Sequence, residues 1–304
     1  AQTEFKDYDF EGSGMNILLD TLAYNTHYLG FNANMLANEM FLDSASLRSS
    51  VVSHAKSLGY EVSSPRAPIA VINVSLTTTA STKTMPAGTA FTTSVEGTGY
   101  QFVTIADVTA SNTGSSVPFD SVNVYEGTYV TTRYTVDTSD VDQSFTLGDA
   151  NADTSTLTVK VQTSSSDTST TTYTKATDIT QLNSNSTVYY LQETDSGLFE
   201  VYFGDGTVSK ALSDGNIVIL QYVVTNKSLA NGANSFSSPT SIDSVTSVTT
   251  TTVSGATGGA EAESIDSIKL NAPLDYAAQG RAVTVDDYKT YTKKLFPNTQ
   301  AVSV

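Results

Sequence analysis

The stretch Ile69-Ala70-Val71-Ile72-Asn73-Val74 marks the point at which this 304-residue sequence changes its pattern. It is a short apolar run dominated by β-branched residues, which is typical of a buried strand. Before it, apolar residues recur at helical spacing. After it, short Val-, Thr-, Tyr- and Phe-rich segments alternate with Gly, Asn, Asp and Ser turns up to about Val253. The sequence therefore predicts an α+β fold, with N-terminal helices, an elongated multi-part β-rich body and a short C-terminal helical segment.

Two helices are predicted upstream of this stretch. Ser13 is a candidate N-cap of the first, in which apolar residues recur from Met15 onward, and Gly30 makes a kink or a division into two helices possible there. Asp43 or Ser44 can cap the second helix, and Gly59 is placed as its left-handed C-terminal residue. The buried stripe of the second helix is predicted to contain Leu47, Val51, Ala55 and Leu58.

Two hairpin signals lie in the β-rich region. Leu198–Phe203 leads into Gly204-Asp205-Gly206, which suits a tight primed turn, and Asp214-Gly215 precedes the apolar strand Ile217–Val224. The Ser/Thr-rich stretch Thr163–Thr172 buries little, so it is either an exposed hairpin arm or a mobile insertion.

The C-terminal part is predicted to be a linker followed by helices. Thr249–Thr252 and Gly255–Gly259 have linker composition, and Ala260–Leu270 can form a short helix. Thr284 is placed to cap a last helix, with Asp287 at the capping-box position. Gln300–Val304 resembles a strand cut off within the element, so we expect the natural protein to continue. These divisions predict a helical region 1–64, a β-rich body 65–254 with a variable Ser/Thr-rich portion at about 76–188, and a linker with the start of a C-terminal assembly domain at 255–304.

Composition excludes several classes of function. The net charge is −16, which argues against a nucleic-acid partner held through phosphate contacts. With no cysteine there is no disulfide framework, iron–sulfur cluster or thiol nucleophile. The apolar runs are too short to span a bilayer, so no membrane partner is expected. Ser and Thr make up 86 of the 304 residues, a composition that favours an extended β-rich surface.

The sequence contains no constellation of residues that catalysis or metal binding requires. His27 and His54 each stand alone on a predicted helix, and the loop Asp149–Asp153 departs from a calcium-binding loop at Thr154 and Lys160. Asp205 and Asp214 could form a glycosidase-like pair on adjacent strands, but turn chemistry explains both more simply because each precedes a glycine. We therefore predict no catalytic residue, no metal site and no cofactor.

Several segments resemble one protein family. These segments are Asp7–Ser13, Leu22–Thr26, Leu47–Val52, Phe203-Gly204-Asp205-Gly206, Gly215–Tyr222, Asn231-Gly232, Gly258–Glu263, Ala272-Pro273, Tyr276, Gln279-Gly280-Arg281-Ala282-Val283-Thr284 and Asp287-Tyr288. In this order they resemble the larger baseplate wedge subunit of T-even-like contractile-tailed phages and its baseplate J-like relatives. No single motif is specific, but the blocks follow one another along nearly the whole chain. About residues 76–188 show no detailed resemblance. Relative to that family, the first few tens of residues and the rest of the C-terminal region are missing.

The resemblance implies a structural role in the virion, at the tail baseplate. In that family two copies of the subunit join another wedge protein through a bundle of N-terminal helices, and six wedges ring the hub next to the proteins that initiate the sheath. The first predicted helix has apolar residues on more than one side, which suits such a bundle. We accordingly expect burial between chains for Leu18, Leu22, Leu29 and Leu36.

Two other functions remain open from the sequence. The Tyr- and Ser/Thr-rich body could belong to a receptor- or glycan-binding tail protein, and Asp205 with Asp214 could belong to a tail-associated hydrolase. Within the first interpretation, the subunit is expected to link baseplate opening to sheath contraction, with pivots near Gly12–Gly14 and Gly255–Gly259.

Overall fold

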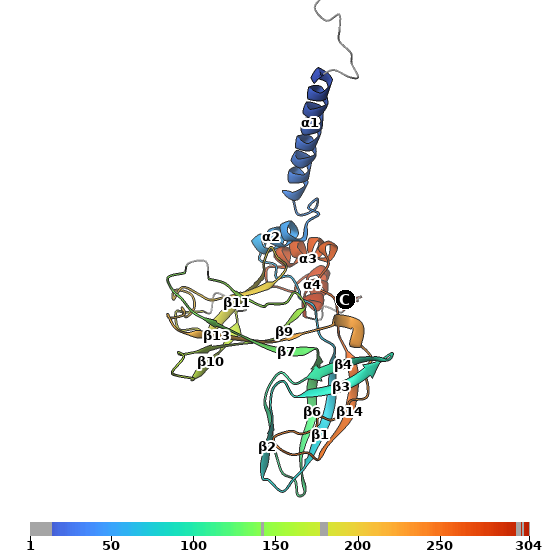
Figure 1. Cartoon of the computed structure of the whole chain (residues 1–304), viewed down its shortest axis with the longest axis vertical. Helices are drawn as coiled ribbons and strands as arrows, with labels where there is room; N and C mark the ends of the chain where they lie inside the picture. The colour runs from blue at the N-terminus through green and yellow to red at the C-terminus, as the bar shows by residue number, and fades with distance from the viewer. Residues whose placement is uncertain (1–13, 141–142, 177–181, 296–298, 300, 304) are drawn as a thin grey trace, which may run out of the picture.

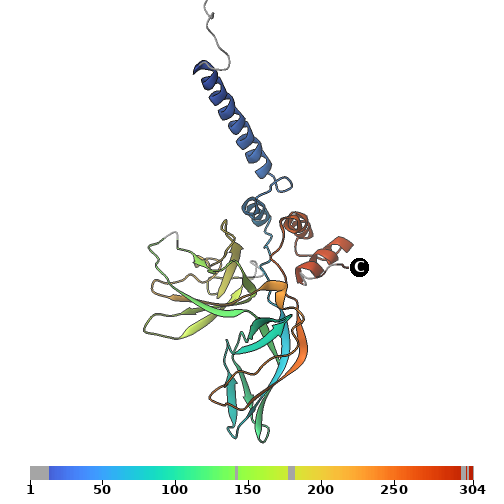
Figure 2. The ribbon, with the colours of Figure 1, turned by 45° about the vertical axis from the view of Figure 1, so that its right-hand side comes forward.

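The computed structural model describes residues 14–140, 143–176, 182–295, 299 and 301–303. The predicted α+β class is confirmed: one long helix projects from a group of three shorter helices, which lies beside two β-sheets (Figure 1). Turning the molecule by 45° leaves the long helix extended away from the rest of the chain (Figure 2).

The N-terminal helices are α1 (Gly14–Glu39) and α2 (Arg48–Ser57). α1 continues through Gly30 as one helix, because a single helical glycine costs only about 1 kcal/mol relative to Ala. The expected N-cap Ser13 lies outside the described residues. Gly59 has φ +80°, and its amide donates to the Lys56 carbonyl, which confirms the left-handed position after α2.

The expected cap of α2 is wrong. Its N-cap residue is Leu47, which has no side-chain capping bond, so neither Asp43 nor Ser44 occupies this position. Val51 and Ala55 are fully buried as predicted, but Leu47 remains 45 % exposed. A carboxylate from the end of α1 binds the free amides at the start of α2, as described below.

The first sheet has five strands in the order β14-β1-β6-β4-β3. The central strand β1 pairs antiparallel with β6 and β14, so that Ile72 faces Val122 on one side and Thr252 on the other. Its core contains Ile72, Leu76, Phe91, Phe102 and Phe119, each at most 1 % exposed. The strands are β1 (Ile69–Thr77), β3 (Ala90–Val95), β4 (Thr98–Val103), β6 (Ser116–Glu126) and β14 (Val248–Thr257), and a separate pair is formed by β2 (Thr82–Met85) and β5 (Val108–Ser111).

The predicted linker at Thr249–Thr252 and Gly255–Gly259 is wrong. Residues up to Thr257 form the edge strand β14 instead. Gly259 is closely packed, since a Cβ atom there would lie 2.5 Å from both the Lys227 carbonyl oxygen and the Pro68 ring. Threonine is common in linkers and in strands, and here pairing with β1 decides the outcome. This segment therefore does not act as the expected pivot. At the other expected pivot, Gly12 lies outside the described residues, and Gly14 begins α1.

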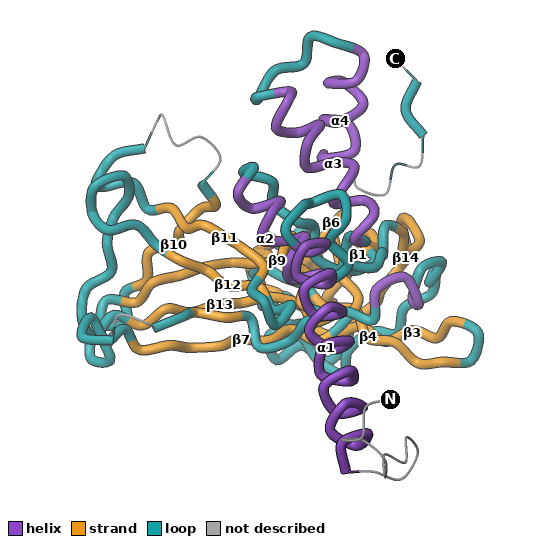
Figure 3. The backbone as a smooth tube through the Cα atoms, turned by 90° about the horizontal axis from the view of Figure 1, so that it is seen from above, coloured by secondary structure: helices purple, strands orange, loops and turns teal. Residues whose placement is uncertain are grey.

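The second sheet has seven strands in the order β7-β13-β9-β10-β11-β12-β8 and lies to one side of the first when seen from above (Figure 3). Its pairs are antiparallel except for β10 with β11, which run parallel. Thr163–Ser169 forms the exposed connection of the β9–β10 hairpin. The strands are β7 (Thr128–Thr135), β8 (Phe145–Thr146), β9 (Ala152–Gln162), β10 (Thr170–Lys175), β11 (Val188–Glu193), β12 (Phe199–Tyr202) and β13 (Ile217–Val224), followed by the 3₁₀ helix η3 (Lys227–Ala230).

The predicted hairpin through Gly204-Asp205-Gly206 is wrong. β12 pairs with β11 and β8, whereas the next strand, β13, pairs with β7 and β9. Residues 203–216 form a longer connection between the two positions in the sheet. Local turn chemistry is therefore present without the strand pairing that it usually accompanies.

Two buried carboxylates lie where the sheets meet. Glu126, at the end of β6, is 0 % exposed and accepts hydrogen bonds from the Thr225 hydroxyl and from both the backbone and side-chain amides of Asn226. Asp153, on β9, is 1 % exposed and accepts the amide of Ala67 at 2.8 Å. These bonds connect segments that flank different sheets, and they satisfy charges that would otherwise be costly to bury.

The C-terminal helices are α3 (Ile265–Ala278) and α4 (Val285–Leu295). Ser264 caps α3, which begins later than the helix expected at Ala260–Leu270. The predicted capping box of α4 is confirmed, since the Asp287 amide donates to Thr284 Oγ1 and the Thr284 amide donates to Asp287 Oδ2. Residues 301–303 have no regular secondary structure, and the other two residues of the expected terminal strand, Gln300 and Val304, lie outside the described part.

Candidate assembly surface

The most extensive exposed apolar surface of the described chain belongs to α1. None of the α1 residues is buried. The four leucines expected in a bundle, Leu18, Leu22, Leu29 and Leu36, are 61–69 % exposed in the single chain. The other large apolar residues on the helix and just beyond it are at least 41 % exposed: Met15, Ile17, Leu19, Tyr24, Tyr28, Phe31, Met35 and Met40.

These side chains form one wide apolar arc. Leu22, Leu29 and Leu36 recur every seven residues, and Leu18 lies one turn before Leu22, so the leucines share a stripe. Tyr24, Tyr28 and Phe31 extend the arc on one flank, where the Tyr24 hydroxyl donates to that of Tyr28 at 2.9 Å. The opposite side is polar and includes Asp20, His27 and Asn34. A surface helix that packs on its own domain needs a narrower stripe than this arc.

The elbow between α1 and α2 is fixed by Glu39. Its Oε1 accepts the Ser46 amide at 2.8 Å and the Ser46 hydroxyl at 2.7 Å, and both carboxylate oxygens accept the Leu47 amide. These bonds lower the pKa of Glu39 to about 2. The Glu39 carbonyl also lies 2.9 Å from His54 Nε2. The last residue of α1 thus acts as the N-terminal cap of α2, and it limits the angle between the two helices.

Arg48 joins α2 to the second sheet and to the segment before α3. Its Nε and Nη2 donate to the two carboxylate oxygens of Glu193 at 2.7 and 2.8 Å, and its Nη1 donates to the Glu263 carbonyl at 2.5 Å. The Glu193 side chain is only 3 % exposed. Lys175 and Glu61 form a second ion pair between these regions. The orientation of α2, and through the elbow that of α1, is therefore coupled to the β-rich body.

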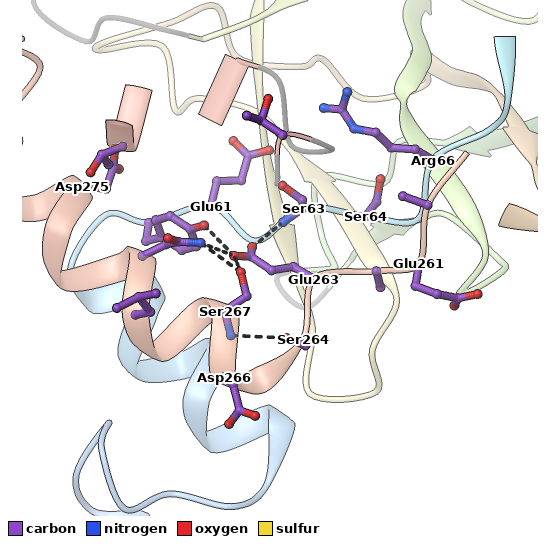
Figure 4. Close-up of a pocket in the computed structure, with 17 residues that line it drawn as sticks. Glu61, Ser63, Ser64, Arg66, Glu261, Glu263, Ser264, Asp266, Ser267 and Asp275 are labelled. Atoms are coloured by element: carbon purple, nitrogen blue, oxygen red, sulfur yellow. Dashed lines mark hydrogen bonds between the residues drawn. The ribbon is translucent and has the colours of Figure 1, made fainter. Parts of the chain in front are cut away.

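A groove of about 470 Å³ lies below these helices, between Tyr60–Arg66, Ala260–Ser264, α3 and α4 (Figure 4). Within it, the Glu263 carboxylate accepts hydrogen bonds from the Tyr60 hydroxyl, the Ser63 amide, the Ser267 hydroxyl and the Asn271 amide. Burial and the charge of Glu263 raise the pKa of Tyr60. Because these polar groups satisfy one another, they fasten α3 to the segment after α2 and do not define a ligand site.

The family-motif residues occupy structural positions. Phe203 packs against Phe145 and Tyr173 with ring centroids 5.7 and 5.4 Å apart. A Cβ atom on Gly204 would lie 1.9 Å from Ser209 Oγ. Gly206 has φ +89°, a conformation that favours glycine.

The motif residues of the C-terminal helices lie in and around α3 and α4. Pro273 is inside α3, and Gln279 ends that helix in the left-handed conformation. The Arg281 amide donates to the Ala278 carbonyl. Tyr288 is half exposed on α4, next to the Thr284–Asp287 capping box.

The residues singled out for possible chemistry are not brought together by the fold. Asp205 Oδ1 accepts the Thr207 amide, which lowers the pKa of Asp205, while Asp214 Oδ1 accepts the Thr138 amide beside β13. The strands that they flank are not neighbours in the sheet, contrary to expectation. Asp149 Oδ1 accepts the Asn151 amide, as predicted for an Asx turn.

The two histidines remain on separate helices. His27 contacts Tyr28 edge-on, and His54 lies at the elbow. Among the described residues no group of three or more His, Asp or Glu side chains is arranged to hold a metal ion. None of the described helices combines the length and apolar character needed to cross a membrane.

Glu39, Arg48, Glu193 and Glu263 are the functional residues that sequence patterns did not identify. Each bonds across a long sequence separation or a bend, and in sequence each resembles an ordinary surface charge. The low overall charge content of 15 % was the only available signal, because in such a chain a charged residue has fewer neighbours of its own kind.

Comparisons with known proteins give a consistent result. Residues 1–60 match the family described as baseplate wedge protein gp6-like, helical domain, and residues 131–233 match that described as bacteriophage baseplate wedge protein gp6, third domain. The chain is also similar to the baseplate wedge protein gp6 of Enterobacteria phage T4, with 31 % identity over 323 aligned positions that cover 97 % of this chain and 48 % of the relative. The chain thus spans about half the length of that relative. Baseplate J is the name of a different subunit and is not among these matches.

Proposed function

Because the chain belongs to the gp6-like family of baseplate wedge proteins, we propose that it is a structural, non-enzymatic component of a phage tail baseplate wedge, located in the virion. The exposed apolar arc of α1 is the observation that carries this proposal, because it is an assembly surface without a partner in the single chain. The relation to a wedge protein favours this role over receptor or glycan binding and over hydrolysis.

The size of the arc favours a bundle of at least three helices. With 26 residues, α1 is about 39 Å long and roughly 10 Å wide. One neighbouring helix covers on the order of 400 Å² of it in projection, about half of the roughly 800 Å² that each partner buries in a stable interface. Two neighbours bring the buried area to that range and cover both the leucine stripe and its aromatic flank.

The proposed partners are a second copy of this chain and another wedge protein, which together with α1 form the bundle. Neighbouring baseplate proteins and the proteins that initiate the sheath contact the remaining surface. The proposed division of labour assigns bundle formation to residues 1–64, the body to residues 65–254 and further assembly contacts to residues 255–304. No cofactor is part of the proposal.

The contacts at the elbow support a mechanical role. Glu39 holds α1 on α2, and Arg48 holds α2 on the second sheet, so a displacement of the bundle is passed to the body without a loose joint. We propose that this coupling contributes to the rearrangement of the baseplate that accompanies sheath contraction. Pre- and post-contraction baseplates in which α1 keeps one orientation to the body support this role, and a changed elbow angle contradicts it.

The test of the bundle is a double substitution, Leu22→Asp with Leu29→Asp, in the leucine stripe. Burying two carboxylates in an apolar seam is strongly unfavourable, so wedge assembly should be lost while the isolated chain stays folded. The matched control is His27→Asp with Asn34→Asp, which places two carboxylates on the polar side of α1 and should leave assembly intact. Co-purification with the other wedge proteins measures both. Unchanged assembly of the leucine variant would rule out the bundle.

A further inference from the structure

We infer that two copies of α1 associate side by side in parallel and in register, and that Asn25 and Asn32 specify this arrangement. The inference rests on the proposed bundle and assigns one of its contacts: the occupant of the leucine stripe is a second copy of this chain. It is carried by the positions of two asparagines within an otherwise apolar seam.

The seam consists of two sets of residues, each with seven-residue spacing. One set is wholly apolar and contains Met15, Leu22, Leu29 and Leu36. The other begins with Leu18 and continues with Asn25 and Asn32. Both asparagines are exposed, and their side-chain amides have no hydrogen-bond partner among the described residues. Such alternating sets form the contact of a coiled coil.

Pairing geometry then decides the direction of the second helix. In a parallel, in-register pair, each residue of a set faces the same residue of the other copy, so Asn25 meets Asn25 and Asn32 meets Asn32. Each amide has both a donor and an acceptor, so two facing asparagines satisfy one another. In an antiparallel pair, each set faces the other set, and both asparagines would be buried against leucine or methionine. A buried amide without a partner is costly, so the parallel arrangement is favoured.

The charges on α1 agree with a second copy as the occupant. Although the chain carries −16, the flanks of the seam (Leu19, Thr21, Thr26, Tyr28, Ala33 and Met35) bear no charge. Asp20 lies on the opposite, polar side. Glu39, which follows Asn32 by seven residues, is turned toward Ser46 and Leu47. Two copies therefore meet without repulsion between like charges, and because no flanking ion pairs are available to set direction, this role falls to the asparagines.

The absence of cysteine from the chain makes the arrangement directly measurable, because a single introduced cysteine reports only its own position. In the full 304-residue chain, Leu29→Cys should form disulfide-linked dimers on mild oxidation, while the control Asn34→Cys, on the polar side, should not exceed background. Mixing Leu18→Cys chains with differently tagged Leu36→Cys chains tests direction. We expect only 18–18 and 36–36 links, and an abundant 18–36 link would overturn the parallel arrangement.

The role of the asparagines is tested by combining Asn25→Leu and Asn32→Leu with the same cysteines. Association should be at least as strong, but links between unlike positions should now appear. Unchanged selectivity would show that the asparagines do not specify direction. If no seam cysteine forms a link and the chain is monomeric at every concentration, the proposed bundle itself fails, whereas an 18–36 link refutes only the present inference.

Discussion

The guanidinium of Arg48 on α2 forms a two-point ion pair with Glu193 at the end of β11, with N–O distances of 2.7 and 2.8 Å. These residues are 145 positions apart in the sequence. The pair joins the helical part of the chain to the second sheet, and its planar geometry restricts the orientation of α2 more than a single hydrogen bond can.

Replacing Arg48 with Leu should destabilise the fold. The Glu193 carboxylate would remain buried without its partner, at a cost of about 2–3 kcal/mol, the lower part of the range for buried pairs because Arg48 is one-third exposed. Denaturant unfolding measures the change. The control Lys56→Leu removes an exposed charge from the same helix and should change stability by less than about 0.5 kcal/mol. Equal effects of the two variants would contradict a special role for the pair.

The Glu39 carboxyl should titrate at about 2, below the usual range for glutamate. Its pKa is lowered in the folded state, so its contribution to stability is present above the unfolded pKa, about 4.3, and is lost as the pH falls through about 2. NMR of the side-chain carboxyl carbon gives the midpoint. Ser46→Ala removes one donor and should raise the midpoint, whereas Ser57→Ala on α2 should not. A midpoint near 4 in the unchanged chain would refute the capping role.

Gly204→Ala should be destabilising and Ser209→Ala should not. The new Cβ would overlap Ser209 Oγ, and such overpacking costs roughly 1–3 kcal/mol. Ser209 Oγ is buried without a hydrogen-bond partner among the described residues, so its removal should be neutral or stabilising. Gly99→Ala, where a Cβ meets open space, is the control for the loss of a glycine. Thermal unfolding compares all three, and equal shifts for the two glycine variants would be inconsistent with the close contact.

Asp153 should make stability depend on pH in the opposite sense to Glu39. Burial raises its pKa, although the Ala67 amide and Ser155 partly offset this effect. The contribution of a group with a raised folded pKa is present below its unfolded pKa and is lost as the pH rises through the folded value. The stability of the unchanged chain relative to Asp153→Asn should therefore increase as the pH is lowered from 7 to 4. The exposed Asp195→Asn variant should show no such trend, and a flat difference for Asp153 would contradict its burial as a charge.

Patterns that depend on near neighbours in the sequence were predicted correctly. The apolar spacing in α1 and α2, the left-handed Gly59 and the Thr284–Asp287 capping box all follow from interactions within one or two turns of a helix. The strand beginning at Ile69 and the apolar strand ending at Val224 also follow from local composition. Each of these signals requires no knowledge of what the segment packs against.

Errors arose where distant partners decide the structure. The Thr-rich segment before Thr257 is an edge strand because β1 offers it a partner, and the turn at Gly204–Gly206 does not form a hairpin because β11 and β8 flank β12 in the sheet. The expected caps of α2 at Asp43 or Ser44 were displaced by Glu39, which reaches back from the end of the preceding helix. In each case a local preference was overridden by a contact that only the folded chain provides.

The sequence by itself determined that α1 is an apolar, nearly uncharged helix with leucines and asparagines at seven-residue spacing, because helical periodicity fixes which side chains share a face. Only the tertiary structure decided that this helix stands free of the body and that its base is held by Glu39, Arg48 and Glu193. That outcome depends on hydrogen bonds and ion pairs between residues far apart in the sequence, whose geometry exists only after the sheets and helices have packed together.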